Sequence, residues 1–210
     1  MARIKPINRK DVPDLEPFFS GTENRMGFLP NSQLIMAYKP KLVQAFTMLS
    51  QAVHDPENRT SRQLRALVAN AASKTAGCQY CVAHTAESAH HASVEDRKIS
   101  AIEQFETSPL FTEAERVALR FAERAAEVPN AVTDEDFAAL RQHYSDQEIV
   151  EIVSVISYFG FLNRWNDTFG TELEASPLDF AEAVLSETGW SPGKHNPRGR
   201  SEEPTTPKAI

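Results

Sequence analysis

Two cysteines and one histidine at helical spacing are the residues of this sequence that could carry redox chemistry. Cys78 and Cys81 form a C-x-x-C pair, and His84 follows one turn later. At about 100° per residue, these three side chains share one helix face with Thr85 and Ser88. Two thiols one turn apart can close a disulfide, and an imidazole beyond them can accept or return a proton. The spacing therefore predicts a dithiol–disulfide site.

The residue before the pair favours a reactive thiolate. Gly77 tolerates the positive φ at which many helices end, so we expect one helix to end there and the next to begin at once. Cys78 then lies in the first turn of the second helix. Free N–H groups and the positive end of the helix dipole at that position favour thiolate over thiol.

The cysteines also admit other interpretations. They are the two cysteines of a long chain, so they form no disulfide framework, and a thioredoxin motif would need a βαβ context that is absent. They could supply half of a zinc site with His84 as a third ligand, although a structural zinc site needs four ligands. They could also be inert and buried on an apolar face, where free cysteine is common. We favour the redox pair over both.

Composition and charge narrow the class of protein. The 210 residues carry a formal charge of −7, and 41% of them are hydrophobic, which predicts one domain with a sizeable core. An acidic balance without a cluster of lysine and arginine argues against nucleic-acid and membrane-surface partners. The longest apolar stretch, 149–162, contains Glu151 and is too short to cross a bilayer, and the N-terminus lacks the apolar segment of a signal peptide. We expect a soluble, cytoplasmic protein.

The elements that must position the cysteine motif are helices. Breakers are rare in the middle of the chain, where Pro109 and Pro129 are the only prolines between residues 57 and 176. Apolar residues recur at helical spacing across 64–75, and 149–162 is apolar without a clear polar side, which predicts a central buried helix. No segment alternates like a strand. The sequence predicts an all-α fold, a bundle of roughly eight helices.

Local signals predict where helices begin and where the folded domain ends. A hydroxyl residue followed three positions later by a carboxylate marks a helix start. Such pairs are Thr112 with Glu115, Ser145 with Glu148, and, as weaker examples, Thr133 with Asp136 and Ser93 with Asp96. We expect residues 1–188 to form one helical domain and residues 189–210, rich in proline and glycine, to form a C-terminal tail.

Polar residues follow the predicted central helix. Arg164 and Asp167 are three positions apart and could pair across one helical turn. We favour a network that satisfies buried polar groups at the helix end over a role in binding an acidic substrate. His54, His143 and His195 lie in loops or at helix ends and receive no role.

Together, the motif and its flanking helices resemble a known superfamily. The segment GCQYCVAHT at 77–85, preceded by LRALVANAAS at 64–73, is similar to the alkylhydroperoxidase D/carboxymuconolactone decarboxylase superfamily. The resemblance covers about residues 15 to 175. Further matching segments are KPKL at 39–42, DEDFAALR at 134–141, SDQEIVEI at 145–152 and FLNRWND at 161–167.

The resemblance implies an all-α homo-oligomer, commonly a trimer or hexamer, that reduces hydroperoxides. By analogy, Cys81 attacks the peroxide oxygen, and Cys78 resolves the sulfenic acid to a disulfide that an external dithiol then reduces. His84 tunes the thiolate and carries the proton. The cycle needs no metal, haem or flavin. The alternatives are a decarboxylase or lactone hydrolase that uses His84 as acid and base, and an oligomeric binding protein without catalysis.

Three positions depart from the family pattern. Ala66 stands where the peroxidase members have a glutamate twelve residues before the first cysteine, and alanine cannot carry a proton. Thr85 stands at the usual place of the relay histidine, with His84 one residue earlier. Tyr80 precedes the second cysteine, where some members have histidine. These departures predict weak peroxide turnover unless Glu87, a tail residue or a neighbouring subunit completes the relay.

Overall fold

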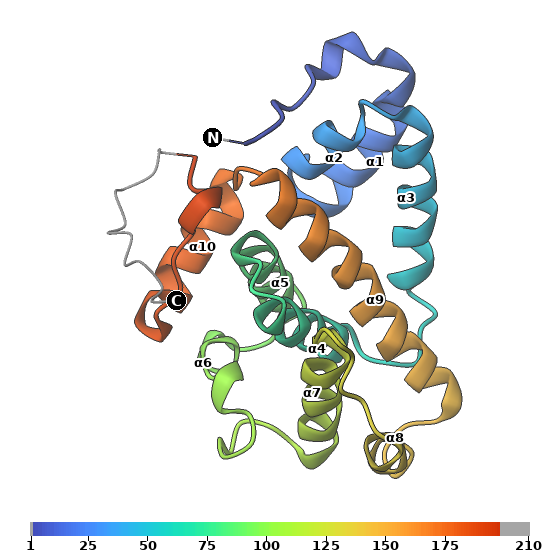
Figure 1. Ribbon diagram of the computed structural model, residues 1–210, viewed down its shortest axis with the longest axis vertical. Helices are drawn as coiled ribbons and strands as arrows, with labels where there is room; N and C mark the ends of the chain where they lie inside the picture. The colour runs from blue at the N-terminus through green and yellow to red at the C-terminus, as the bar shows by residue number, and fades with distance from the viewer. Residues whose placement is uncertain (1, 198–210) are drawn as a thin grey trace.

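A computed structural model describes residues 2–197, and every regular element within them is helical (Figure 1). This confirms the predicted all-α class. The α-helices of the described residues are α1 (Glu16–Met26), α2 (Asn31–Met36), α3 (Pro40–Val53), α4 (Arg62–Thr75), α5 (Gln79–His91), α6 (Asp96–Ser100), α7 (Glu113–Ala126), α8 (Asp134–Leu140), α9 (Asp146–Phe169) and α10 (Ala175–Leu185). Eight of these have seven or more residues, in agreement with the bundle of roughly eight helices expected from the sequence.

Three helices begin at the capping boxes predicted from the sequence. Thr112, Thr133 and Ser145 are the N-cap residues of α7, α8 and α9, and each hydroxyl accepts a hydrogen bond from the N–H three residues later. The carboxylate at that third position accepts in return from the N-cap N–H. Each box satisfies two donors that would otherwise lack a partner at the helix start.

The fourth predicted capping pair, Ser93 with Asp96, is wrong. Helix α6 begins at Asp96 with Glu95 as its N-cap residue, and no side chain caps it. Ser93 instead has a φ of +67° and donates its N–H to the carbonyl of His90 at 2.8 Å. It therefore closes the end of α5, and a residue that ends one helix in the left-handed conformation is not free to cap the next.

Helix α4 lies at the centre of the fold and packs against α5, α7 and α9. Leu67 and Val68 of α4 are fully buried in this contact. Helix α9, orange in Figure 1, crosses the molecule diagonally and also packs against α3. Because α4, α5 and α9 are in mutual contact, side chains from all three can line a common cavity.

The prediction that segment 149–162 forms a central, buried helix holds for its inner side and is wrong for its outer side. Ile152 and Val155 of α9 are fully buried, whereas Val150 is 64% exposed and Phe161 is 39% exposed. Within the described chain, helices cover the inner side of α9 and leave part of its outer side in contact with solvent. The lack of a polar side in segment 149–162 therefore did not mean that every side of α9 is buried.

The junction between α4 and α5 forms as expected, with a shift of one residue. Gly77 adopts a φ of +71°, which glycine tolerates at low cost. Cys78 is extended and is the N-cap residue of α5, so it lies one residue before the first turn in which it was predicted. Its N–H donates to the carbonyl of Ser73 at 3.2 Å, which ties the motif to the end of α4.

The chain returns to the cysteine motif after α10. A 3-10 turn spans Gly193–His195, and the side chain of His195 is fully buried. The carbonyl of His195 accepts from the N–H of Leu173 at 2.9 Å.

The predicted boundary after residue 188 stays a prediction, and residues 198–210 of the predicted tail lie outside the described residues. No helix in residues 2–197 has the length and apolar character needed to span a membrane.

Candidate active site

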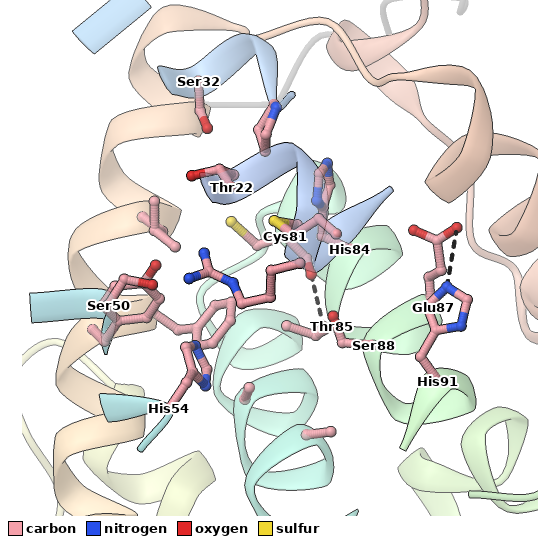
Figure 2. Close-up of a pocket in the computed structure, with 18 of the residues that line it drawn as sticks. Thr22, Ser32, Ser50, His54, Cys81, His84, Thr85, Glu87, Ser88 and His91 are labelled. Atoms are coloured by element: carbon pink, nitrogen blue, oxygen red, sulfur yellow. Dashed lines mark hydrogen bonds and ion pairs between the residues drawn. The ribbon is translucent and has the colours of Figure 1, made fainter. Parts of the chain in front are cut away.

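A cavity of about 440 Å³ lies between α1, α2, α3, α4, α5 and α9. Its walls are mainly apolar, and Phe46, Tyr158 and Phe159 contribute aromatic surface. Figure 2 shows Cys81 and His84 of α5 facing the space, with Ser50 and His54 of α3 across from them. The cavity is large enough for a small organic molecule, and it brings that molecule to one of the two thiols.

The two cysteines differ in their access to the cavity. Both are free thiols and both are buried. Cys81 is part of the cavity wall, whereas Cys78 lies behind it and does not line the cavity. Asn166 Nδ2 donates to the Sγ of Cys81 at 3.6 Å and orients it from α9. A molecule in the cavity therefore meets Cys81 first.

The environment separates the acidities of the two thiols. A hydrogen bond with Cys81 lowers the pKa of Cys78 to about 5; burial opposes this shift, and the donor and charge of His195 add to it. Burial raises the pKa of Cys81, and the neighbouring Cys78 sulfur raises it further. These opposite shifts favour Cys78 as the thiolate of the pair and Cys81 as the thiol that donates to it. The predicted preference for a thiolate at the helix start applies to Cys78.

His84 is held by a carboxylate from a distant helix start. Its Nε2 lies 2.7 Å from Oε2 of Glu174, the N-cap residue of α10. The hydroxyl of Tyr80 donates to Oε1 of the same carboxylate at 2.9 Å, and the rings of Tyr80 and His84 stack with centroids 4.2 Å apart. This network fixes the imidazole in the cavity wall beside Cys81. Glu174 had no local signal in the sequence, since it lies ninety residues from His84.

His195 is a second histidine at the motif, and the sequence analysis gave it no role. Its Nδ1 lies 2.7 Å from the carbonyl of Thr171, so Nδ1 carries the proton and donates. Its Nε2 lies 3.7 Å from Oδ1 of Asp167 and faces the sulfur of Cys78. Asp167 in turn pairs with Lys194 at 2.6 Å, rather than with Arg164, the partner that the spacing allowed. Burial of the turn after α10 places His195 here.

The same three residues are the group within residues 2–197 that could bind a metal ion. The Sγ of Cys78, a carboxylate oxygen of Asp167 and a ring nitrogen of His195 lie within 4.8 Å of one another. Three ligands are fewer than a structural zinc site uses, and Lys194 already neutralises the carboxylate. His84, the third ligand considered for zinc, points to Glu174 instead.

The positions that depart from the family pattern lie close to the thiols. Ala66 lines the cavity without a polar group. The Oγ1 of Thr85 donates to the carbonyl of Cys81 at 2.7 Å and accepts from Asn70 Nδ2 at 2.8 Å, so it is committed to structural hydrogen bonds. Glu87 also lines the cavity, where it accepts from Ser176 and lies 4.0 Å from Nε2 of His91 (Figure 2).

Comparison with known proteins places this architecture in a family. Residues 40–124 match the model of the carboxymuconolactone decarboxylase family. The debrominase Bmp8, a variant of which was crystallised with 2,3,4-tribromopyrrole, is similar to this chain: that structure shares 35% identity, has a TM-score of 0.80, and the match covers 86% of this chain and 96% of Bmp8. An uncharacterised protein with an alkylhydroperoxidase AhpD core from Ralstonia eutropha JMP134 shares the fold, with 21% identity, a TM-score of 0.76 and coverage of 86% and 95%.

Curated sequences are more distant. YnjA of Escherichia coli (strain K12) is 29% identical over 103 residues, which cover 49% of this chain and 57% of YnjA. The chain thus matches little more than half of that relative. YdfG of Bacillus subtilis (strain 168) is 25% identical over 121 residues, 57% of this chain and 80% of YdfG. On the match to the family model and on the likeness to Bmp8 over nearly its whole length, the chain belongs to the carboxymuconolactone decarboxylase family and has the alkylhydroperoxidase D-like fold.

Proposed function

We propose that this protein is a dithiol oxidoreductase that reduces a hydroperoxide bound in the cavity through a disulfide between Cys81 and Cys78. The proposal rests on the different positions and acidities of the two thiols. Cys81 faces the cavity, and Cys78 lies directly behind it as a thiolate ready to resolve the oxidised sulfur. A binding protein with structural cysteines would have no need for a lowered pKa at one of them.

The first step transfers one oxygen atom to Cys81. As the Sγ of Cys81 attacks the outer peroxide oxygen, its proton moves to the Cys78 thiolate with which it is hydrogen-bonded. The O–O bond breaks, Cys81 becomes a sulfenic acid, and the remaining alkoxide takes a proton from the cavity wall. His84 is the nearest candidate donor on α5, and Glu174 keeps its ring in place.

The second step closes the disulfide. Cys78 attacks the sulfur of the sulfenic acid, the S–O bond breaks, and hydroxide leaves as water. The two sulfurs supply the two electrons. The proton that Cys81 passed to Cys78 leaves with the hydroxide as water, and the proton from the cavity wall leaves with the alcohol. The Nε2 of His195, which lies beside Cys78, accepts the proton of Cys78 as it attacks and passes it to the hydroxide; Ala66, at the position of the family glutamate, cannot carry a proton. An external dithiol then returns the pair to the reduced state.

The need for an external dithiol indicates the compartment in which the protein works. An external dithiol is available where the compartment is reducing, so we expect the protein to work in the cytoplasm. We also expect a homo-oligomer, a trimer or hexamer, as the family resemblance implies.

A second candidate reaction is reductive dehalogenation, and the likeness to Bmp8 favours it. In the corresponding reaction of this chain, Cys81 passes its proton to Cys78 and attacks a ring halogen, the carbon takes a proton from the cavity wall, and a sulfenyl halide forms. Attack by Cys78 then closes the same disulfide and releases halide. Both reactions use the same dithiol, the same cavity and the same two electrons, and they differ in the atom that Cys81 attacks.

Single-turnover product analysis distinguishes the two candidates. Reduced protein is mixed with one equivalent of cumene hydroperoxide or of 2,3,4-tribromopyrrole, and cumyl alcohol and bromide are measured against thiol loss. We expect one alcohol per disulfide with the hydroperoxide, and no product in either reaction with Cys81→Ser. Bromide without alcohol would select dehalogenation. Thiols that stay reduced with both substrates would refute the dithiol cycle and favour acid–base chemistry at His84 or a binding role.

A further inference from the structure

A buried arginine forms part of the cavity wall. Arg65 of α4 is only 6% exposed and lines the same cavity as Cys81. Its Nη1 donates to the carbonyl and, at 3.3 Å, to the hydroxyl of Thr60. Among residues 2–197, Arg65 forms no ion pair. A buried guanidinium normally has an anionic partner, because removing its charge from water is costly.

The carboxylates closest to Arg65 are already engaged or lie at a distance. Glu151 acts on Arg65 electrostatically, but its oxygens accept from the N–H and the hydroxyl of Thr60, each at 2.8 Å, and from the N–H of Arg59 at 3.1 Å. Asp55 also acts on Arg65 without an ion pair, and burial lowers the pKa of the guanidinium. Arg65 lines both the cavity and the hollow beside it, and within residues 2–197 the hydrogen bonds of its guanidinium are those of Nη1 to Thr60.

Two more arginines make this end of the cavity positive. Arg25 and Arg62 line it, and neither forms an ion pair within the described part of the chain. Their effect is visible at His54, whose pKa is lowered to about 4 by burial and by the charges of Arg25, Arg65 and Arg62. His54 is therefore neutral at pH 7 and does not add to the charge. This positive region belongs to a protein whose formal charge is −7.

The positive end continues toward the surface. A second, more open hollow shares Arg62 and Arg65 with the cavity and adds Arg59 to its wall. In Figure 2, Cys81 and His84 lie between His54 and Ser50 on one side and Glu87 with His91 on the other. The hollow also has His91 in its wall, 4.0 Å from Glu87, so an anion that enters along Arg59 and Arg62 passes the imidazole of His91 on its way to Arg65.

We propose that the substrate is a small organic acid, with a carboxylate held by Arg65 at the positive end, an apolar body against Phe46 and Tyr158, and its reducible group at Cys81. Phe46 and Tyr158 stack with ring centroids 5.2 Å apart and form a flat apolar wall. The planar guanidinium matches a carboxylate in two parallel hydrogen bonds. The part of this proposal that places a reducible group at Cys81 rests on the proposed function. The part that places a carboxylate at Arg65 does not depend on that function.

Binding of matched acids and amides tests this site without turnover. The probes are cinnamate and octanoate, each compared by titration calorimetry with its primary amide, which has nearly the same shape and no charge. We expect at least one carboxylate to bind roughly tenfold more tightly than its amide, because a charge-assisted hydrogen bond contributes more than a neutral one. The preference should fall as ionic strength rises. Equal affinity for acid and amide in both pairs would overturn the proposal.

Substitution of the arginines tests whether they cause the preference for carboxylate over amide. Arg65→Gln should abolish it and Arg65→Lys should retain part of it, while Arg141→Gln, an exposed arginine of another region, should leave it unchanged. If Arg65→Gln does not fold, Arg25→Gln combined with Arg62→Gln keeps Arg65 in place and should still reduce the preference severalfold. A preference that survives all these changes would contradict the site.

The thiol chemistry is checked separately. Cys81→Ser should bind the carboxylate probes as the unmodified protein does, because the arginine site lies on α4. Failure of the dithiol cycle with intact acid preference would refute the proposed reaction alone, and loss of acid preference with an intact cycle would refute the carboxylate site alone.

Discussion

Replacement of His195 by phenylalanine tests how the Cys78 thiolate is stabilised. Phenylalanine fills most of the buried volume but removes both ring nitrogens, the one that donates to Thr171 and the one that faces Cys78. A hydrogen bond to a charged group contributes about 1.5–3 kcal/mol. Since 1.36 kcal/mol corresponds to one pH unit, the pKa of Cys78 should rise from about 5 to roughly 6–7. It should not reach that of a free thiol, because the donor at position 81 remains.

The assay is the ultraviolet absorbance of the thiolate as a function of pH. Both proteins carry Cys81→Ser, so that Cys78 is the one thiol and a hydroxyl donor is kept beside it. At pH 6 the ionised fraction should fall from about nine-tenths to between one-half and one-tenth. His143→Phe serves as a control for loss of a histidine away from the motif, and circular dichroism checks the fold.

The same substitution alters the dependence of stability on pH. Because the pKa of Cys78 is lower in the folded protein than in the unfolded chain, the thiolate stabilises the fold fully above the unfolded pKa near 9. That stabilisation is lost as the pH falls toward 5. His195→Phe should raise the pKa of Cys78 in the folded protein, so the stabilisation should already be lost at roughly pH 6–7 instead of about 5. A titration midpoint and a stability profile that His195→Phe leaves unchanged would refute the assignment of His195 to Cys78.

Other substitutions test the remaining assignments. Cys78→Ser should leave a sulfenic acid on Cys81 that dimedone traps after peroxide treatment, whereas a trapped adduct on Cys78 in Cys81→Ser would reverse the two roles. Ala66→Glu should change peroxide turnover less than twofold, because the histidines of the site already move the protons, and a large gain would show that this route is incomplete. Ser145→Ala should lower the free energy of unfolding by about 1 kcal/mol in urea through loss of the α9 cap, and a similar loss in the exposed mid-helix control Ser157→Ala would contradict that reason.

Local interactions explain which helices could be predicted from sequence. Thr112, Thr133 and Ser145 cap their helices through residues three positions away, so the signal and the structure occupy the same short segment. Ser93 has the same spacing but follows directly on α5, and closing that helix determined its conformation. The outer side of α9 could not be predicted, because its burial depends on where other helices pack.

The residues of the site also divide into those that local spacing could predict and those that it could not. Cys78, Cys81 and His84 were found because one helix face carries all three, although the cavity wall includes only Cys81 and His84. Glu174 and His195 reach the motif from the far end of the chain, and no spacing rule connects them to it. A buried histidine in a 3-10 turn is one of the features that only tertiary structure reveals.

The most direct test of the dithiol cycle is the rate at which free thiols disappear when reduced protein meets one equivalent of cumene hydroperoxide, with the product identified by mass spectrometry. We expect rapid loss of both thiols and an intramolecular disulfide between Cys78 and Cys81. Thiols that survive excess hydroperoxide in the folded protein would contradict the dithiol cycle.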